Sequence, residues 1–176
     1  MLELHACCFF GHRKIEETEE LKGRLYKLIE DLIENRKTDT FLFGSNSEFD
    51  ELCYAVVSKL KETYSHIKRI CVRAAYPDIS EKYENYLLGR YDETYFPPKI
   101  RGAGKASYVE RNQELINRSE ICIVYYNENY VPPKRKSSKR DLSDYQPKSG
   151  TRVAYEYAVK KNRTILNVFA LKGTDA

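Results

Sequence analysis

Short apolar runs that alternate with amphipathic stretches are the feature that most limits how this chain can fold. The uncharged apolar runs are all shorter than ten residues, so they are too short to cross a bilayer and have the length of buried strands. The stretches between them carry apolar residues at helical spacing. Strands that are apolar throughout and alternate with helices are typical of a parallel sheet covered on both faces.

The pattern predicts five strands and four helices. We therefore expect an α/β fold, with a single Rossmann-like domain over residues 1–176 and a mainly parallel five-stranded sheet that has helices on both faces. The expected strands cover about residues 4–10, 40–43, 69–74, 121–125 and 164–169. The expected helices cover about residues 15–35, 47–64, 108–117 and 151–161.

Two long segments have no place in this minimal plan. Residues 77–105 are polar and rich in tyrosine, and residues 128–148 contain the basic cluster 134–140. Loops of this length in a compact domain are usually functional or disordered. Both are expected near the carboxyl ends of strands, where open α/β sheets bind their ligands.

The charge of the chain is concentrated in one place. The formal net charge is +4, from 30 Lys+Arg and 26 Asp+Glu, and five of the basic residues lie within residues 131–140, which contain no acid. The rest of the chain is therefore nearly neutral. This distribution argues against a general nucleic-acid-binding protein, in which positive charge spreads over a whole face.

The five cysteines predict buried free thiols in a reducing compartment. Cys7 and Cys8 are neighbours on an expected strand and point to opposite faces, so they cannot share a metal ion, and we expect no metal site. The first ten residues lack the basic region and the cleavage site of a signal peptide. We therefore expect a cytoplasmic protein with no membrane partner.

Small residues follow three of the expected strands, and two of these turns lead into helices. Helix N-termini favour anions through their free N–H groups and their dipole, and Arg13, Arg111 and cations of the loops are candidates for hydrogen bonds to phosphate. Each turn also has an ordinary structural explanation, as a tight turn or a helix cap, and neither GxGxxG nor GxxxxGK[ST] occurs. The three turns are Gly11-His12-Arg13, Gly44-Ser45-Asn46-Ser47 and Ser149-Gly150-Thr151.

These segments resemble the SLOG superfamily and, within it, the YpsA-like proteins. The resemblance extends from about residue 4 to residue 169 and rests on residues 7–13, residues 44–50, Arg111-Asn112 and residues 149–151 followed by Ala158. It implies a Rossmann-like sheet that binds nucleotides or nucleotide-derived ligands at the strand ends. The superfamily also includes the Lonely-Guy phosphoribohydrolases, the DNA-processing protein DprA and ligand-sensing modules of bacterial conflict systems.

Two positions depart from the patterns of these families. Glu48 stands where YpsA-like proteins usually have a glycine, and a carboxylate there would repel a phosphate unless it turns away or binds a ribose hydroxyl. Ala154 stands where the phosphoribohydrolases carry a catalytic glutamate. The nearest acid, Glu156, is two residues further along the expected helix and points roughly 200° away.

The leading hypothesis is a protein that binds a nucleotide or an ADP-ribose-like ligand, as a sensor or to sequester it. Tyr76, Tyr125 or Tyr126 could stack on the base, and the basic segment 134–140 would close over the ligand as a lid. We expect no cofactor, although a phosphate ligand can bring Mg²⁺ with it. The candidate ligand-binding residues are Gly11, His12, Arg13, Gly44, Ser45, Asn46, Arg111, Asn112, Ser149, Gly150 and Thr151.

Two alternatives remain open from the residues alone. In an enzyme that cleaves the N-glycosidic bond of a nucleotide, Arg111 would position the phosphate and a carboxylate such as Glu156 or Asp50 would assist. In a single-stranded nucleic-acid-binding protein, the basic segment and nearby tyrosines would supply charge and stacking. Exposed tyrosine-rich segments also favour self-association, which would make the protein a homo-oligomer.

Overall fold

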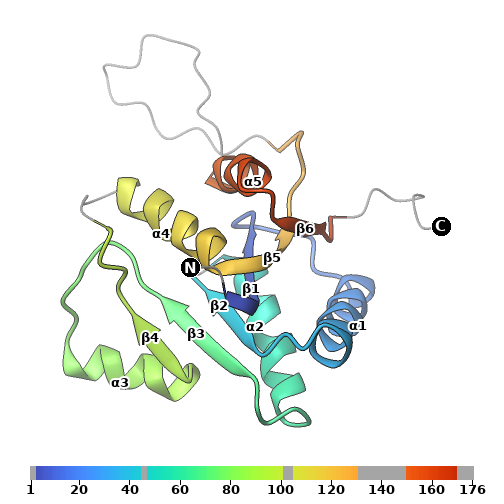
Figure 1. Ribbon diagram of the computed structural model, residues 1–176, viewed down its shortest axis with the longest axis horizontal. Helices are drawn as coiled ribbons and strands as arrows, with labels where there is room; N and C mark the ends of the chain where they lie inside the picture. The colour runs from blue at the N-terminus through green and yellow to red at the C-terminus, as the bar shows by residue number, and fades with distance from the viewer. Residues whose placement is uncertain (1–2, 45–46, 101–104, 131–149, 170–176) are drawn as a thin grey trace.

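The computed structural model of the chain describes residues 3–44, 47–100, 105–130 and 150–169. These residues form one sheet of six parallel strands, together with five helices (Figure 1). The predicted α/β, Rossmann-like fold is thus confirmed, with one strand more than the sequence indicated. The elements are β1 (Glu3–Gly11), α1 (Glu19–Asn35), β2 (Thr40–Phe43), α2 (Glu48–Lys61), β3 (Lys68–Val72), α3 (Glu81–Arg90), β4 (Glu93–Tyr95), α4 (Lys105–Arg118), β5 (Ser119–Tyr125), α5 (Gly150–Lys160) and β6 (Thr164–Asn167).

The strand order across the sheet is β4-β3-β2-β1-β5-β6. The chain adds strands outward from β1 to β4, and α4 then returns it to the other side of β1, where β5 and β6 follow. Cys8 of β1 lies in register with Leu42 of β2 and with Cys122 of β5. Because every strand pair is parallel, the carboxyl ends of all six strands lie at one edge, and the order of strands reverses between β1 and β5.

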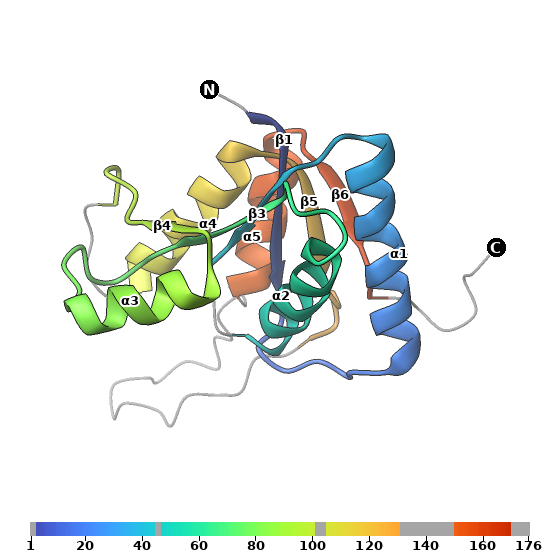
Figure 2. The same ribbon diagram turned by 90° about the horizontal axis from the view of Figure 1, so that it is seen from below.

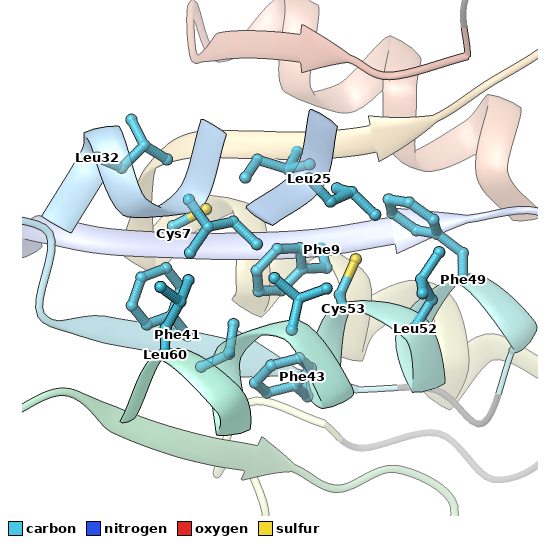
Figure 3. Packing of buried hydrophobic residues seen from close by; sticks show 14 of the residues in the cluster. Cys7, Phe9, Leu25, Leu32, Phe41, Phe43, Phe49, Leu52, Cys53 and Leu60 are labelled. Atoms are coloured by element: carbon cyan, nitrogen blue, oxygen red, sulfur yellow. The ribbon is translucent and has the colours of Figure 1, made fainter. Parts of the chain in front are cut away.

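Alternating side chains of the strands fill two cores on opposite faces of the sheet. Cys7 and Phe9 belong to the core formed with α1, α2 and Leu87 of α3, and Figure 3 shows both side chains pointing toward α1 and α2. Cys8 and Phe10 belong to the core formed with α4 and α5. The predicted coverage of both faces is therefore confirmed, as is the placement of Cys7 and Cys8 on opposite faces.

The prediction that residues 77–105 form one long loop is wrong, because this segment contains α3 and β4. Neither element has the pattern of apolar residues from which the other helices and strands were predicted. Leu87 is the one residue of α3 that is buried, so the helix has almost no apolar stripe, and β4 is a three-residue strand, Glu93-Thr94-Tyr95, at the sheet edge. Figure 2 shows α3 beside β3 and β4 at this edge of the molecule.

Element boundaries differ from the predictions by a few residues. Helix α1 begins at Glu19 rather than near residue 15, because the Thr18 hydroxyl accepts a hydrogen bond from the Leu21 amide at 3.1 Å and caps the helix there. Ser47 caps α2 in the same way through the Asp50 amide, as expected. Of the second predicted loop, residues 131–148 lie outside the described residues. None of the helices in the described ranges is long and apolar enough to cross a membrane.

Candidate functional site

Gly11 ends β1 and lies beside β5, at the point where the strand order reverses. The sequence predicted that this glycine is part of a phosphate-binding turn. A Cβ atom at this position would lie 2.5 Å from Cδ2 of the Phe49 ring, the first aromatic residue of α2. The missing side chain therefore makes room for Phe49, which is fully buried, and the space beside Gly11 is taken by the protein itself.

His12 is buried at the same point, with 2% of its surface exposed. Its Nε2 atom accepts a hydrogen bond from the Asn127 amide at 2.9 Å. The neutral ring therefore carries its proton on Nδ1, and this N–H is buried without a hydrogen-bond partner among the described residues. Burial lowers the pKa of His12, so the neutral ring is favoured near pH 7.

Aromatic rings lie in contact with one another in the crevice between β1 and β5. The His12 ring stacks on Tyr130 with the ring centres 4.0 Å apart, and the edge of Tyr125 lies against it. Tyr125 also packs against Phe49, and Tyr126 stacks on Tyr155 of α5 at 4.6 Å. Tyr125 is therefore a core residue. The described part of this crevice, which is the usual ligand site of a doubly wound sheet, is therefore lined by aromatic rings that pack on one another.

Arg13 and Glu48 form a link between the β1–α1 connection and the start of α2. The Glu48 amide donates to the Arg13 carbonyl oxygen at 2.9 Å, and the Glu48 carboxylate accepts from the Ile15 amide at 2.9 Å. The Glu48 carboxylate thus turns toward the backbone of this connection. The side chain of Arg13 is exposed.

Arg111 on α4 is the predicted site residue whose surroundings are most unusual. It is 5% exposed, its Nη1 donates to the carbonyl oxygen of Gly44, and its Nε donates to Oδ1 of Asn112 at 3.1 Å. Burial lowers the pKa of Arg111, and the nearby carboxylate of Asp50, which is also buried, opposes this shift. A buried guanidinium at the carboxyl end of a strand is costly unless it is balanced by acids or by a ligand.

Gly44 is needed for this arrangement. A Cβ atom there would lie 2.7 Å from Cδ of Arg111 and 3.0 Å from Cδ1 of Leu115. The glycine after β2 therefore lets the arginine side chain cross the strand end. Its neighbours in the predicted turn, Ser45 and Asn46, lie outside the described residues.

Gly44 and Arg111 both line a pocket of about 730 Å³ at the carboxyl ends of β2 and β3. This volume is within the range of small-molecule sites. The opposite wall comes from α3 and from the turn before it, which the sequence reasoning had treated as loop. Eight of the seventeen lining residues are arginines or tyrosines, namely Arg73, Arg90, Arg111, Tyr76, Tyr83, Tyr86, Tyr91 and Tyr108.

The turn after β3 brings Arg73 to the pocket. Its Nη1 donates to the Pro77 carbonyl oxygen at 3.3 Å, and its Nε is buried without a hydrogen-bond partner among the described residues. Ala75 follows with a φ of 74°, and the Tyr76 amide donates to the Ala74 carbonyl oxygen at 2.9 Å, which closes a three-residue turn. Such strained backbone in a non-glycine residue is concentrated at functional sites.

Arg90, at the end of α3, holds that helix against α2. Its Nη2 donates to both carboxylate oxygens of Glu51, at 3.0 and 3.2 Å, and its guanidinium lies over the Tyr54 ring at 4.5 Å. The Tyr54 hydroxyl donates in turn to the Arg90 carbonyl oxygen at 2.6 Å. This arginine thus builds the wall of the pocket while its charge is already balanced.

The remaining predicted residues do not line this pocket. Asn112 and Gly150 meet in a small gap between α4 and α5, Thr151 is buried in the first turn of α5, and Ser149 lies outside the described residues. Glu156, the candidate catalytic acid, is on the exposed side of α5 and pairs with Arg152 at 3.2 Å. It is therefore not brought together with Arg111 in the pocket.

Sequence reasoning missed most of the pocket, although one signal for it was available. Tyr76 was expected to stack on a base and does line the pocket, but Arg73, Tyr83, Tyr86 and Tyr108 were not singled out. Tyrosines spaced three apart in an otherwise polar segment, as in Tyr83 and Tyr86, indicate an exposed helical face of aromatic rings.

The cysteines and other metal-binding side chains do not contribute to a site among the described residues. Cys7, Cys8, Cys53 and Cys122 are buried free thiols, and Cys71 is half-buried at the pocket floor. Burial raises the pKa of the Cys8 thiol. The sulfur atoms of Cys8 and Cys122 are 3.5 Å apart. The described ranges contain no group of three or more His, Cys, Asp or Glu side chains that could hold a metal ion.

The chain matches no protein-family model, and no curated protein is significantly similar to it in sequence.

Proposed function

We propose that the protein binds a nucleotide or nucleotide-derived ligand in the pocket at the carboxyl ends of β2 and β3. The observation that carries this proposal is the lining of the pocket, in which three arginines and five tyrosines surround a space of about 730 Å³. Guanidinium groups bind phosphate through paired hydrogen bonds, and tyrosine rings stack on bases. The pocket also lies at the carboxyl ends of the strands, which is where parallel α/β sheets bind ligands.

In this proposal an arginine of the pocket contacts the phosphate of the ligand, and the tyrosines contact its base. Arg73, in the turn after β3, would bind the phosphate, since it has a buried N–H that lacks a partner among the described residues, and the buried Arg111 of α4 lines the same pocket. Tyr76, Tyr83 and Tyr86 form the outer wall, and each exposes much of its ring to solvent. Exposed aromatic rings beside buried cations favour a ligand with a flat base and an anionic group.

The proposal is tested by offering the purified protein a mixture of nucleotides, ADP-ribose, NAD and cyclic nucleotides. After ultrafiltration, mass spectrometry identifies the compounds that are retained. We expect an intact compound retained in stoichiometric amount. A released base with ribose phosphate would instead identify an enzyme, and no retention of any compound would contradict the proposal.

Two matched variants locate the binding site. Arg73→Gln removes a pocket cation and is expected to weaken binding by about 1.5–3 kcal/mol, the usual value for a hydrogen bond to a charged group. Arg36→Gln removes an exposed arginine at the end of α1, at the opposite edge of the sheet, and is expected to leave binding unchanged. Equal effects of both substitutions would place the ligand elsewhere.

A further inference from the structure

The charged groups that line the pocket nearly balance one another. Three arginines, Arg73, Arg90 and Arg111, face two acids, Glu51 and Asp78. When Asp50, the buried acid beside Arg111, is included, these described side chains carry equal numbers of positive and negative formal charges. A pocket suited to a nucleoside triphosphate would need several uncompensated cations or metal ions near the phosphates.

The three arginines are not equally available to a ligand. Arg90 already donates to both oxygens of Glu51. Arg111 donates to the Gly44 carbonyl oxygen and has the buried carboxylate of Asp50 close by. Each of these two cations therefore has its own counter-charge within the fold.

Arg73 differs from both of them. Its one hydrogen bond from the guanidinium goes to a neutral acceptor, the Pro77 carbonyl oxygen, and the guanidinium lies 5.9 Å from the centre of the Phe96 ring. None of the ion pairs among the described residues includes it, and its buried Nε–H has no acceptor there. Arg73 thus supplies one positive charge that no ion pair among the described residues balances.

We infer that the ligand carries a single negative charge at its phosphate, which makes it a nucleoside phosphodiester rather than a phosphate monoester or a polyphosphate. This inference rests on the proposed function and adds the charge state of the ligand to it. A phosphodiester has one charge at any pH near neutrality, which matches Arg73 alone. A terminal phosphate adds a second charge, which Asp78 on the same pocket wall repels.

Two adenine ligands with one ribose and one phosphate test the charge directly. 3′,5′-Cyclic AMP carries one negative charge, whereas 5′-AMP carries two at pH 8 and one below its second pKa of about 6. We expect cyclic AMP to bind on the order of fivefold more tightly than 5′-AMP at pH 8. This difference in affinity is expected to disappear at pH 5.2, because 5′-AMP gains a proton there while cyclic AMP does not.

Removal of Asp78 supplies the matched variant. Asp78→Asn raises the charge of the pocket by one unit without touching an arginine, so 5′-AMP should gain on the order of fivefold more affinity than cyclic AMP does. Glu62→Gln makes the same chemical change on an exposed residue at the far end of α2, and it should leave the preference unchanged. Both variants can be compared by isothermal titration calorimetry, and circular dichroism shows whether they remain folded.

The phosphodiester could belong to a cyclic mononucleotide or to a linear dinucleotide, and a third ligand separates these sources. Tighter binding of the dinucleoside monophosphate ApA than of cyclic AMP would assign the linear linkage, and the reverse order would assign the cyclic one. Equal or tighter binding of 5′-AMP at pH 8 would overturn the inference and leave the proposed function intact. If the pocket retained none of the nucleotides, both would be overturned.

Discussion

At the residue scale, two glycines at strand ends have a role that differs from the phosphate binding that their sequence context suggests. Gly11 and Gly44 follow strands in the positions of phosphate-binding turns, but the space that each leaves is occupied by a side chain, Phe49 in one case and Arg111 in the other. The glycine after β2 therefore contributes to the pocket indirectly, because it allows Arg111 to reach the strand end. A glycine pattern alone does not distinguish these uses.

Substitution of Gly44 tests this role. Gly44→Ala places a Cβ atom against Cδ of Arg111, so we expect a loss of about 1–3 kcal/mol in the free energy of unfolding, measured by urea denaturation. Gly23→Ala is the control, because nothing lies within 4 Å of a Cβ atom there and alanine favours the interior of α1. That variant should gain about 0.5–1 kcal/mol. Unchanged stability in Gly44→Ala would show that Arg111 is free to move aside.

Buried His12 predicts a dependence of stability on pH. Burial lowers the pKa of His12 in the folded protein below the value of about 6.5 in the unfolded chain. Well above pH 6.5 both states are neutral and the full stability is present. As the pH falls from there toward the folded pKa, the unfolded chain takes up the proton first, so stability decreases.

The variant His12→Gln keeps a side-chain acceptor that can reach the Asn127 amide and removes the titrating group. We expect its free energy of unfolding to change less between pH 7 and pH 5.5 than that of the unchanged protein, as measured by urea denaturation at several pH values. His66→Gln, at an exposed position, is the control. If the free energy of unfolding depends on pH in the same way in His12→Gln as in the unchanged protein, His12 is not the cause of that dependence.

At the scale of elements, the ends of the helices are fixed by contacts that come from distant parts of the chain. The carboxyl end of α4 is an example: Arg163, just before β6, donates from Nε to the Ile116 carbonyl oxygen at 2.8 Å and from Nη2 to that of Asn117 at 3.2 Å. These are carbonyls of the last helical turn, which have no partner within a helix. The guanidinium also complements the negative end of the helix dipole.

Replacement of Arg163 should therefore destabilise the α4–β5 junction. Arg163→Ala is expected to lower the free energy of unfolding by about 1–3 kcal/mol, and Arg163→Lys to restore part of the loss, because an ammonium keeps the charge but not the forked geometry. Lys160→Ala, an exposed residue in the last turn of α5, is the control. If the lysine variant is no better than the alanine variant, the charge at this helix end contributes little.

At the scale of the whole molecule, the sheet is strongest at its centre and weakest at the β4 edge. β1 pairs with both β2 and β5 and is covered by helices on both faces, whereas β4 has three residues and pairs with β3 alone. One wall of the pocket, formed by α3, belongs to this weaker edge. A protein that closes around a ligand draws its moving parts from regions of low local stability.

Native-state hydrogen exchange should show this gradient. Amides of β1 and β5 are expected to exchange at the rate of global unfolding, and amides of α3 and β4 faster by local opening. Leu87→Ala removes the buried anchor of α3 and should speed exchange in α3 and β4 more than in β1. A uniform increase across all strands would show that this edge unfolds only with the rest of the protein.

The sequence alone determined the alternation of elements, because long apolar stripes and apolar strand runs are local patterns that survive in any context. It therefore predicted five of the six strands, four of the five helices and the separation of Cys7 from Cys8. Tertiary structure alone decided the rest. Element β4 is stabilised by pairing with β3, and α3 by Leu87, Arg90 and Tyr54, which are contacts between residues far apart in the chain. The pocket exists only where these elements meet, so no local pattern could reveal that Arg73 and Arg111 face the same space.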